Sequence, residues 1–578
     1  MLDKLYKRKL IEATLSDFVP DLLRTDAFKT FQQLSHRETM ERIKGVVALS
    51  CFEEVAEIAE IEKLFGISDV LLEHLQSLQL ENGLFSGGDN LESPPDSAFT
   101  INDLCSAIEM LSIQGSLSPW QQSTLDSLKR IARKAAPAMY GGGVHTPNHR
   151  WEISSALIGL GVFLEDSTLL DRAQLWLGEG IDIQSDGLYS ERSPNYAAYV
   201  TNPCLISISR RLVKGDYMHI VNRNLRSEAL LLRPDGRLET IESRRQDQFE
   251  PFDPRPFLSQ ARLLAQIEKN PLVVDFAREL SSRKILDPAR HLTELVLNPL
   301  IALCLPDHGN CSAQSKVESG KELSYTDFCE SKLSRVVLRG SLIKPTETAT
   351  VYAGSDFNRF FRVASGLSNN PTIFSYLTQG ICLESLRISP NFFDLGPLRP
   401  DSLSRDRDLW ILEDTISSGY YGPLVSSEQS ASGEYELTDD GRFYAQMAFG
   451  KRHKSRMELS ARISISVKTG AFSVRVHFAG PTTPFACALG LTGRHLKIIQ
   501  GALKDGEAYY AVEGSPVVVS NGHQALDLVG HGASLPYHFP YKSGEAYEYI
   551  NGDDVFPGLK LVFNGLTSDA FSIEGRLR

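Results

Sequence analysis

The first half of the chain has apolar side chains at the spacing of an α-helix. In residues 151–164 the apolar positions recur every third or fourth residue and form one stripe, and residues 123–135 and 168–177 show the same spacing. Ser123 is the expected N-cap of its helix, and Gly178 marks the end of another. Similar segments follow one another, with short Gly-, Pro- and Asp-rich links, through the first half of the chain. This pattern predicts paired helices in a layered or toroidal array, with a cleft at one end where connecting loops place functional groups.

The hydrophobic pattern then changes to that of β-strands. Residues 307–327 are polar and have no period, which is typical of a linker. Further on, apolar and polar residues alternate on both sides of a "KTG" turn in residues 462–478, and this alternation predicts a β-hairpin. Residues 347–354, 507–514 and 559–565 are also strand-like. The second half therefore predicts an antiparallel β-sandwich.

The two patterns give an α+β multidomain protein. A chain of 578 residues is too long for one ordinary hydrophobic core. We expect a helical (α/α) toroid domain at residues 1–315 and an antiparallel β-sandwich domain at residues 316–578.

Composition narrows the class of protein. The apolar content of 42% and the charged content of 23% are ordinary for a globular protein. The eight cysteines are scattered without a C-x-x-C pair, which argues against a disulfide framework or a structural zinc site. The N-terminal segment is charged and has no apolar signal-peptide core, and no apolar run is long enough to span a bilayer. We therefore expect a cytoplasmic protein with no membrane partner.

The charge balance limits the possible ligands. The formal net charge is −12 and there is no long basic run, so nucleic acid is not an expected partner. Long-range attraction of an anionic substrate would be unfavourable. Such a substrate would have to be held by arginines concentrated in one cleft.

Two short stretches concentrate polar and charged side chains directly before helices. The first, "VHTPNHRWE", contains Asn148, His149 and Arg150, and the second, "SERSPNYAAY", contains Glu191 and Tyr196. Each residue type also has an ordinary structural role. An Asn before a helix is a common N-cap, and the tryptophan of the first stretch is expected in the core.

The order of these stretches, within a helical half that precedes a β half, resembles the heparinase II/III-like superfamily of polysaccharide lyases. Members of that superfamily carry an Asn, often followed by His, at the start of a toroid helix, and later a Tyr in an E-x-S-P-x-Y context. The resemblance implies that Asn148, His149 and Tyr196 are catalytic and that Glu191 belongs to the second motif.

The resemblance also implies a chemistry. A lyase of this kind removes the proton at C5 of a uronic acid and expels the oxygen at C4. The neighbouring carboxylate must be neutralised or hydrogen-bonded as enolate-like charge develops, which would be the role of Asn148 and Arg150. Tyr196 would act as base, as acid or as both if nearby cations favour its phenolate. His149 is the other candidate base.

Two further stretches supply candidate substrate-binding residues. Residues 82–99 are rich in turn-forming and polar residues, and Asp96 is placed to bind sugar hydroxyls, with Asp89 and Asn90 nearby in sequence. Residues 242–257 contain the adjacent pair Arg244 and Arg245 among aromatic residues and prolines. A solvated charge run is the default interpretation of such a string, but adjacent arginines also suit bidentate recognition of a carboxylate.

The chain departs from the superfamily pattern in its β half. Members usually supply a catalytic His within an H-x-D-x-G-x-F strand. The corresponding residues 365–380 have Ser368 at the His position and Asn370 at the Asp position. We therefore expect no metal and no cofactor, and Asn370 becomes a candidate hydrogen-bonding group for the substrate.

Three functions remain open at this point. The first is a lyase that cleaves uronate-containing oligosaccharides or polysaccharides by β-elimination. The second is a glucuronidase-like glycoside hydrolase that uses paired carboxylates such as Asp96, Glu152 and Glu191. The third is a carbohydrate-binding protein without catalysis. The partner in each case is an anionic carbohydrate, and the oligomeric state is left open.

Overall fold

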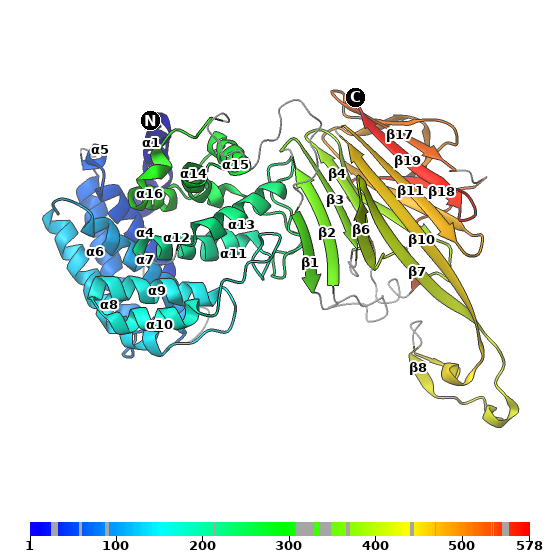
Figure 1. The fold of residues 1–578 in the computed structure, drawn as a ribbon, viewed down its shortest axis with the longest axis horizontal. Helices are drawn as coiled ribbons and strands as arrows, with labels where there is room; N and C mark the ends of the chain where they lie inside the picture. The colour runs from blue at the N-terminus through cyan, green and yellow to red at the C-terminus, as the bar shows by residue number, and fades with distance from the viewer. Residues whose placement is uncertain are drawn as a thin grey trace. The chain divides into compact units, whose positions relative to one another are not determined.

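The chain forms two compact units in the computed structural model (Figure 1). One consists of Met1–Ala229 with Arg245–Lys316, and the other of Leu230–Arg244 with Val317–Arg578. The structure describes residues 1–24, 33–56, 60–86, 92–212, 216–307, 329–334, 348–355, 357–365, 370–439, 444–468, 470–532, 535, 537–545 and 554–578. The predicted linker at 307–327, apart from residue 307, and the predicted boundary between residues 315 and 316 lie outside these ranges.

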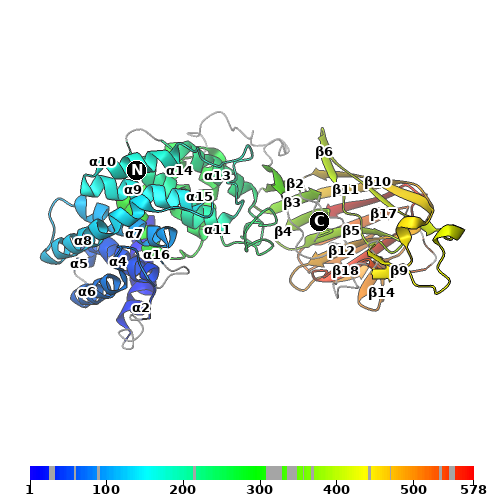
Figure 2. The same ribbon diagram turned by 90° about the horizontal axis from the view of Figure 1, so that it is seen from below.

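The helical unit is built around a ring of helices (Figures 1 and 2). Neighbouring members of the ring contact one another in sequence order, and the last contacts the first. Within the described residues the ring consists of α4 (His36–Ser50), α7 (Pro94–Ser112), α9 (His149–Leu164), the continuous run α11 (Pro194–Tyr196), η2 (Ala197–Thr201) and α12 (Asn202–Arg211), the run η3 (Arg255–Phe257) and α14 (Leu258–Ile267), and α16 (Pro288–Leu297). This arrangement is the predicted toroid.

Side-chain contacts show that neighbouring ring helices point the same way. Arg37 near the start of α4 forms an ion pair with Asp96 near the start of α7. Seven residues further along both helices, Lys44 lies 2.5 Å from Asp103. On another neighbouring pair, Ser259 in the first turn of α14 contacts the ring of His291 in the first turn of α16 at 2.7 Å. The N-terminal ends of the ring helices therefore gather at one end of the ring, which we call the rim.

The remaining helices pack around the ring or connect its members. Their bounds are α1 (Lys4–Ala13), η1 (Thr14–Phe18), α2 (Val19–Leu23), α5 (Glu53–Ala56), α6 (Ile61–Leu78), α8 (Pro119–Gly141), α10 (Ser167–Leu177), α13 (Met218–Leu230), α15 (Pro271–Ser282) and η4 (Pro299–Ala302). In the described part of the chain, no helix has the length and apolar character needed to cross a bilayer.

The structure corrects two local predictions. α9 is buried on every side from Trp151 to Gly161, rather than along a single stripe, because a ring helix packs against neighbours on all faces. α8 begins earlier than predicted. Its N-cap is Ser118, whose hydroxyl accepts from the Gln121 amide in a capping box, and Ser123 lies within the helix. The predicted end of α10 at Gly178 is confirmed.

The second unit consists of antiparallel sheets. A nine-stranded sheet has the order β1-β2-β3-β4-β5-β12-β18-β15-β14, and an eight-stranded sheet has the order β13-β16-β17-β19-β11-β10-β7-β6, within the described residues. The pair β15–β18 is parallel. The strands are β1 (Cys329–Ser334), β2 (Thr348–Ser355), β3 (Arg359–Ser365), β4 (Phe374–Thr378), β5 (Cys382–Pro390), β6 (Ser402–Asp406), β7 (Leu409–Tyr421), β10 (Lys454–Lys468), β11 (Ala471–Ala479), β12 (Pro484–Thr492), β13 (Lys497–Gln500), β14 (Ala502–Asp505), β15 (Ala508–Ala511), β16 (Val517–Ser520), β17 (Ala525–His531), β18 (Leu559–Leu566) and β19 (Phe571–Leu577).

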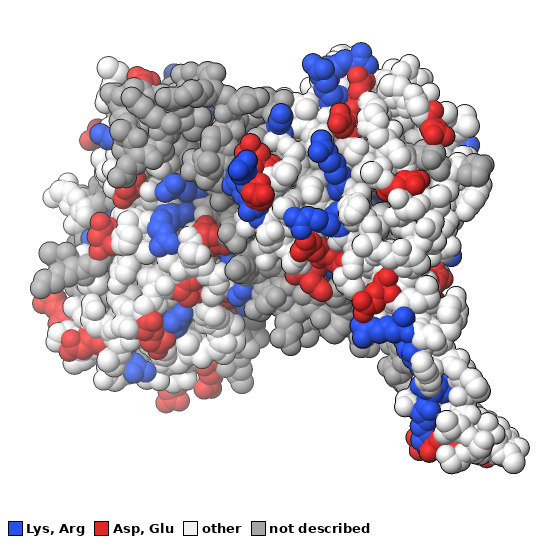
Figure 3. Space-filling model, turned by 45° about the vertical axis from the view of Figure 1, so that its right-hand side comes forward, with Lys and Arg blue, Asp and Glu red and all other residues white. Residues whose placement is uncertain are grey.

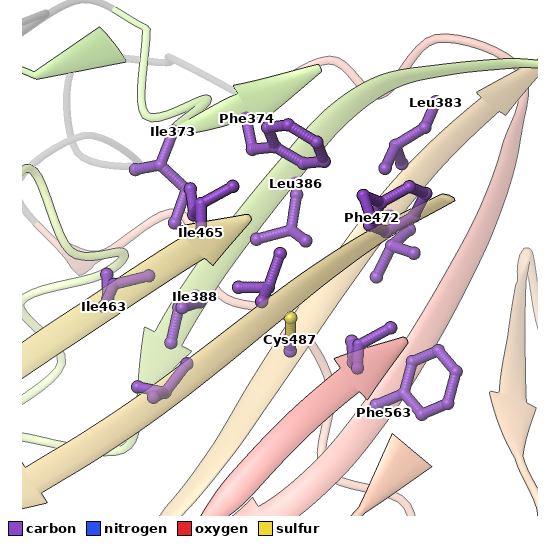
Figure 4. Close-up of a cluster of buried hydrophobic side chains, with 14 of the residues drawn as sticks. Ile373, Phe374, Leu383, Leu386, Ile388, Ile463, Ile465, Phe472, Cys487 and Phe563 are labelled. Atoms are coloured by element: carbon purple, nitrogen blue, oxygen red, sulfur yellow. The ribbon is translucent and has the colours of Figure 1, made fainter. Parts of the chain in front are cut away.

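The apolar faces of the two large sheets form the core of this unit. Side chains from both sheets interdigitate there, for example Leu386 and Ile388 of β5 with Ile463 and Ile465 of β10 (Figure 4). The predicted hairpin is confirmed as β10–β11, with Ile465 opposite Val474. β7 and β10 extend beyond the other strands and lead to the small pair β8 (Leu437–Asp439) and β9 (Tyr444–Gln446) (Figure 1).

The segment Leu230–Arg244 is held on the nine-stranded sheet by buried charges. Glu239 accepts a hydrogen bond of 2.7 Å from Arg362 on β3 and lies 3.6 Å from Arg233. Burial opposes ionisation of Glu239, but these arginines and two backbone amides hold the pKa of its carboxyl below the usual value. Ile241 packs against Val351 and Ala364.

Candidate active site

The rim carries the polar stretches singled out from the sequence. Asn148 and His149 lie at the start of α9, and Tyr196 lies in the first turn of the α11–η2–α12 run. The loop 245–254, which leads into η3, adds Arg245. The contacts of each side chain show which of these residues lie together.

Asn148 occupies the N-cap position of α9 but its side chain does not cap the helix. Its Oδ1 accepts a hydrogen bond of 2.6 Å from the Thr146 hydroxyl. Its Nδ2 is buried and has no hydrogen-bond partner among the described residues, while the residue as a whole is 2% exposed. An unpaired buried amide is costly for the fold, and this one can donate to a ligand.

His149 is the first residue of α9 and is partly buried. Its ring lies 4.6 Å from the His145 ring and 6.5 Å from the Phe99 ring, measured between centroids. Burial lowers the pKa of His149 to about 4, and the charges of His145, Arg245 and Arg37 contribute to the same shift. The imidazole is therefore neutral near pH 7, and its buried Nδ1 has no partner in the described part of the chain.

The phenol oxygen of Tyr196 accepts two hydrogen bonds. Nη2 of Arg245 donates to it at 2.7 Å and Nε2 of Gln246 at 3.0 Å. The guanidinium also lies over the ring, 4.2 Å from its centroid. The Tyr196 backbone amide is held by the Ser193 hydroxyl, which caps α11. The phenol oxygen therefore has two donors directed at it, one of them cationic.

Glu191 contacts the same Arg245 guanidinium as Tyr196 does. Nη1 of Arg245 donates to its carboxylate at 3.0 Å. Burial raises the pKa of Glu191 to about 7; Arg245 opposes that shift, and the negative charges of Asp182 and Asp247 add to it. Glu191 is therefore a carboxyl that changes protonation state near neutral pH.

A second wall of the site comes from α4 and α7. Arg37 forms an ion pair with Asp96 and lies over the Phe99 ring, 4.0 Å from its centroid. Since Phe99 also contacts His149 edge-on, this wall is continuous with the start of α9.

Arg245 links two of the three residues predicted to be catalytic, Tyr196 and His149. Arg245 binds Tyr196 directly, and its charge lowers the pKa of His149, which neighbours Asn148 in sequence. Asp96, Glu191 and Arg245 belong to the same group of side chains. Basic and acidic side chains are interspersed over the face shown in Figure 3.

Arg150 and Glu152 contact residues outside the group around Arg245. Arg150 lies 3.0 Å from Glu179, 3.8 Å from Asp182 and over the Trp151 ring. Glu152 is 3% exposed and accepts a hydrogen bond of 2.6 Å from Asn102. Burial raises the pKa of Glu152 to about 7.

Two candidates belong to the second unit. Arg244 is exposed. Asn370 is partly buried and its Oδ1 accepts from the Thr372 amide at 3.0 Å, which is a local turn contact. Ser368, Asp89 and Asn90 lie outside the described residues. Trp151 is fully buried, as expected of a core residue.

Two residues of the site had not been selected from the sequence. Arg37 lies between Ser35 and Glu38, which form a capping box, and that box marks the helix start at which Arg37 is placed. Gln246 follows the arginine pair directly, but nothing in its local sequence distinguishes it. Within the described ranges no three His, Cys, Asp or Glu side chains gather closely enough to hold a metal ion.

Comparisons with known proteins find similarity in solved structures alone. No protein-family model and no curated protein matches the chain. The chain is similar to a mutant of heparan sulfate lyase HepC from Pedobacter heparinus at 12% identity, covering 93% of this chain and 76% of that chain with a TM-score of 0.42. It is also similar to heparinase III, at 10% identity over 88% of this chain and 73% of that chain with a TM-score of 0.41. A heparinase III with methylated lysines gives 11% identity, coverage of 89% and 74%, and a TM-score of 0.44. At such identities and TM-scores, no residue role or substrate is carried over from these proteins.

Proposed function

We propose that the protein is a lyase that cleaves uronate-containing oligosaccharides or polysaccharides by β-elimination. The observation that supports this most directly is the pair of donors, Arg245 and Gln246, on the phenol oxygen of Tyr196. A phenol in such a setting can take a weakly acidic carbon-bound proton and return a proton to a leaving oxygen.

In the proposed elimination, the phenolate of Tyr196 removes the proton at C5 of the uronate. The electron pair of that C–H bond forms the C4–C5 double bond, and the bond between C4 and its glycosidic oxygen breaks. The protonated Tyr196 then gives its proton to the leaving oxygen. The products are an unsaturated uronate and a sugar with a free hydroxyl group.

Asn148 and Arg245 are suited to stabilise the uronate carboxylate. The unpaired Nδ2 of Asn148 needs an acceptor, and the Arg245 guanidinium offers a fork of donors. Donors placed where negative charge develops are worth most in a site from which water is excluded. The proposal gives this role to Arg245 rather than to Arg150, because Arg245 contacts the Tyr196 oxygen directly, whereas Arg150 lies against Glu179 and Asp182.

His149 is the second candidate base. With a pKa of about 4, its imidazole is uncharged near pH 7 and so can accept a proton. In that arrangement His149 takes the C5 proton and Tyr196, as a neutral phenol, protonates the leaving oxygen. Asp96 and Phe99 would contact the sugar.

One observation favours a second function, that of a glycoside hydrolase. Glu191 has a pKa of about 7, which is what a general acid for a glycosidic oxygen requires. The other carboxyls considered are less suited to be its partner, because Glu152 is almost fully buried and Asp96 is paired with Arg37.

A panel of uronate polymers and oligomers tests the proposal. A lyase releases products with ultraviolet absorbance from the new conjugated double bond. Release of reducing sugar without that absorbance would identify a hydrolase and refute the elimination. Absence of any product from every member of the panel would also refute it.

A further inference from the structure

A second group of charged side chains lies at the end of the ring opposite the rim. We call it the base cluster; it consists of Glu109 of α7 and of Arg210 and Arg211 of α12. Each of these residues lies in the last turn of its helix. In the ring, α9 stands between α7 and α12 and contacts both. The cluster therefore joins two helices that are not direct neighbours in the ring.

Glu109 bridges the two arginines. Nε of Arg210 donates to its carboxylate at 2.5 Å and Nη2 at 2.9 Å. Nε of Arg211 donates to the same carboxylate at 2.9 Å. Burial opposes ionisation of Glu109, but the hydrogen bonds and charges of both arginines hold the pKa of its carboxyl below the usual value. The three side chains therefore carry two positive charges and one negative charge.

The guanidinium of Arg211 is buried and only partly paired. Its side chain is 3% exposed. Nη1 and Nη2 are both buried and have no hydrogen-bond partner among the described residues. The described part of the chain places no carboxylate other than Glu109 within ion-pair distance of Arg211. Because an arginine stays charged and a buried charged donor without a partner is costly, these two nitrogens need an acceptor.

The groups around these nitrogens are small and uncharged. A Cβ atom at Gly159 of α9 would lie 2.9 Å from Nη1 of Arg211 and 2.7 Å from the sulfur of Cys105. A Cβ atom at Gly161 would instead meet Leu170 of α10 at 2.7 Å, so Gly159, two residues away, is on the opposite face of α9 and turned to the inside of the ring. Burial raises the pKa of the Cys105 thiol to about 12, so this thiol is neutral and does not balance the charge of Arg211.

We propose that the base cluster binds one halide ion, chloride being the common one, through Nη1 and Nη2 of Arg211. A single negative charge balances the excess positive charge of the cluster, whereas a sulfate or phosphate dianion would leave an excess of negative charge in a buried place. A monatomic anion also needs no donors beyond the two that the guanidinium offers. The ion would hold α7, α9 and α12 together inside the ring. The site is separate from the rim and does not depend on the proposed elimination.

The competing occupant is a water molecule, which accepts hydrogen bonds but leaves the charge uncompensated. Crystals of the full chain grown in sodium bromide distinguish the two, because bromide scatters X-rays anomalously and water does not. We expect an anomalous peak within hydrogen-bonding distance of Nη1 and Nη2 of Arg211. Density at that place without an anomalous signal, or no density, overturns the inference.

Thermal unfolding tests the site in solution. The melting of the helical unit is followed by circular dichroism at fixed ionic strength while sodium chloride replaces sodium gluconate, whose anion is too large for an enclosed site. A ligand that binds only the folded state raises the melting temperature as its concentration rises. We expect a rise of about 2 °C or more that saturates with chloride. A wild-type melting temperature that does not rise with chloride overturns the inference.

Two arginine variants locate the effect. Arg211→Gln leaves Glu109 balanced by Arg210 and should abolish the chloride-dependent rise. Arg226→Gln, at an exposed position on α13, removes the same charge elsewhere and should keep the rise. A rise that persists in Arg211→Gln contradicts the assignment to the base cluster. The bromide crystals use the wild-type protein, so they decide the question even if Arg211→Gln does not fold.

Discussion

The carboxylate of Glu191 and the guanidinium of Arg245 form an ion pair of 3.0 Å, through Nη1 of the arginine. Nη2 of the same guanidinium donates to Tyr196. The protonation state of Glu191 therefore decides how much of the positive charge of Arg245 is available to the phenol. Because burial raises the pKa of Glu191 to about 7, this control operates near neutral pH.

Substitution of Glu191 by Gln should shift the pH profile of elimination. Wild-type Glu191 ionises as the pH rises through about 7, and the new negative charge then competes with Tyr196 for Arg245. The amide introduced by Glu191→Gln stays neutral at every pH, so it does not compete with Tyr196 for the charge of Arg245. We expect the acid limb of kcat/KM to move to lower pH with activity retained.

The same variant separates the two candidate functions. A hydrolase that uses Glu191 as its acid would lose most of its activity on Glu191→Gln, by about 100-fold or more. Rates measured from about pH 5 to pH 9, with both ultraviolet absorbance and reducing sugar as readouts, decide between them. A profile with an unchanged acid limb would refute the coupling through Arg245.

Substitution of Tyr196 by Phe should abolish most of the elimination. Removing a general acid–base group typically lowers the rate by about 10²–10⁴-fold, and substrate binding should persist because the ring remains. Tyr189→Phe is the matched control in the same stretch. The Tyr189 hydroxyl donates to Asn202 inside the ring at 2.6 Å, so its loss should lower the melting temperature and leave kcat nearly unchanged. Similar kcat values for the two variants would contradict the role of Tyr196.

Substitution of Arg245 by Lys tests the guanidinium fork. A lysine keeps the charge but cannot bind Glu191 and Tyr196 at once, so kcat/KM should fall by about 100-fold, the usual cost of one oriented donor. Arg150→Lys changes the pairing with Glu179 at the outer side of α9, and its effect should be less than about tenfold. Initial rates at saturating and limiting substrate measure both. The reverse order of effects would return the carboxylate-binding role to Arg150.

The comparison of Arg150 with Arg245 also shows what the sequence could predict. Local periodicity predicted the helices α8, α9 and α10 and the β10–β11 hairpin, because hydrophobic spacing depends on near neighbours alone. The motif residues Asn148 and Tyr196 were selected because each belongs to a polar stretch directly before a helix, and the structure places both at the start of a ring helix. Arg150 is only two positions beyond Asn148, but residues at this spacing do not share a helix face, so it pairs with Glu179 instead.

Groups that join the site through long-range contacts could not be found in this way. Arg37 reaches Asp96 and Phe99 from another helix, and the sequence shows only a charged residue after a cap. Gln246 gains its role from Tyr196, fifty residues away in the chain. The raised pKa of Glu152 likewise follows from its burial within the ring, which a single-stripe interpretation of α9 did not predict.

Asn148 and Asn202 should respond in opposite ways to substitution by Ala. Asn202 bonds to Tyr189, Asn224 and Gln260 inside the ring, and its loss should lower the free energy of unfolding by about 2 kcal/mol or more, because buried partners are left unsatisfied. The side chain of Asn148 is bonded only to Thr146 among the described residues, and its Nδ2 is unpaired. Its loss should change stability by less than about 1 kcal/mol but lower kcat by about 100-fold. Urea unfolding and initial rates on both variants provide the test, and a large stability loss in Asn148→Ala would show a structural role.

Substitution of Glu152 by Gln should stabilise the helical unit at alkaline pH. Burial raises the pKa of Glu152 from 4.5 to about 7, so the folded state binds more protons than the unfolded state between these values, and stability falls as the pH rises through this window. At about 1.4 kcal/mol for each pKa unit, the loss is on the order of 3 kcal/mol above pH 7. The side chain introduced by Glu152→Gln carries no charge, and its amide oxygen can still accept from Asn102. We expect Glu152→Gln and wild type to unfold at similar urea concentrations at pH 5, and the variant to be more stable at pH 8, as followed by helical circular dichroism.

Glu81→Gln, at an exposed position, is the control and should match wild type at both pH values. A Glu152→Gln variant that is no more stable than wild type at pH 8 would show that other groups inside the ring stabilise the ionised Glu152 carboxylate.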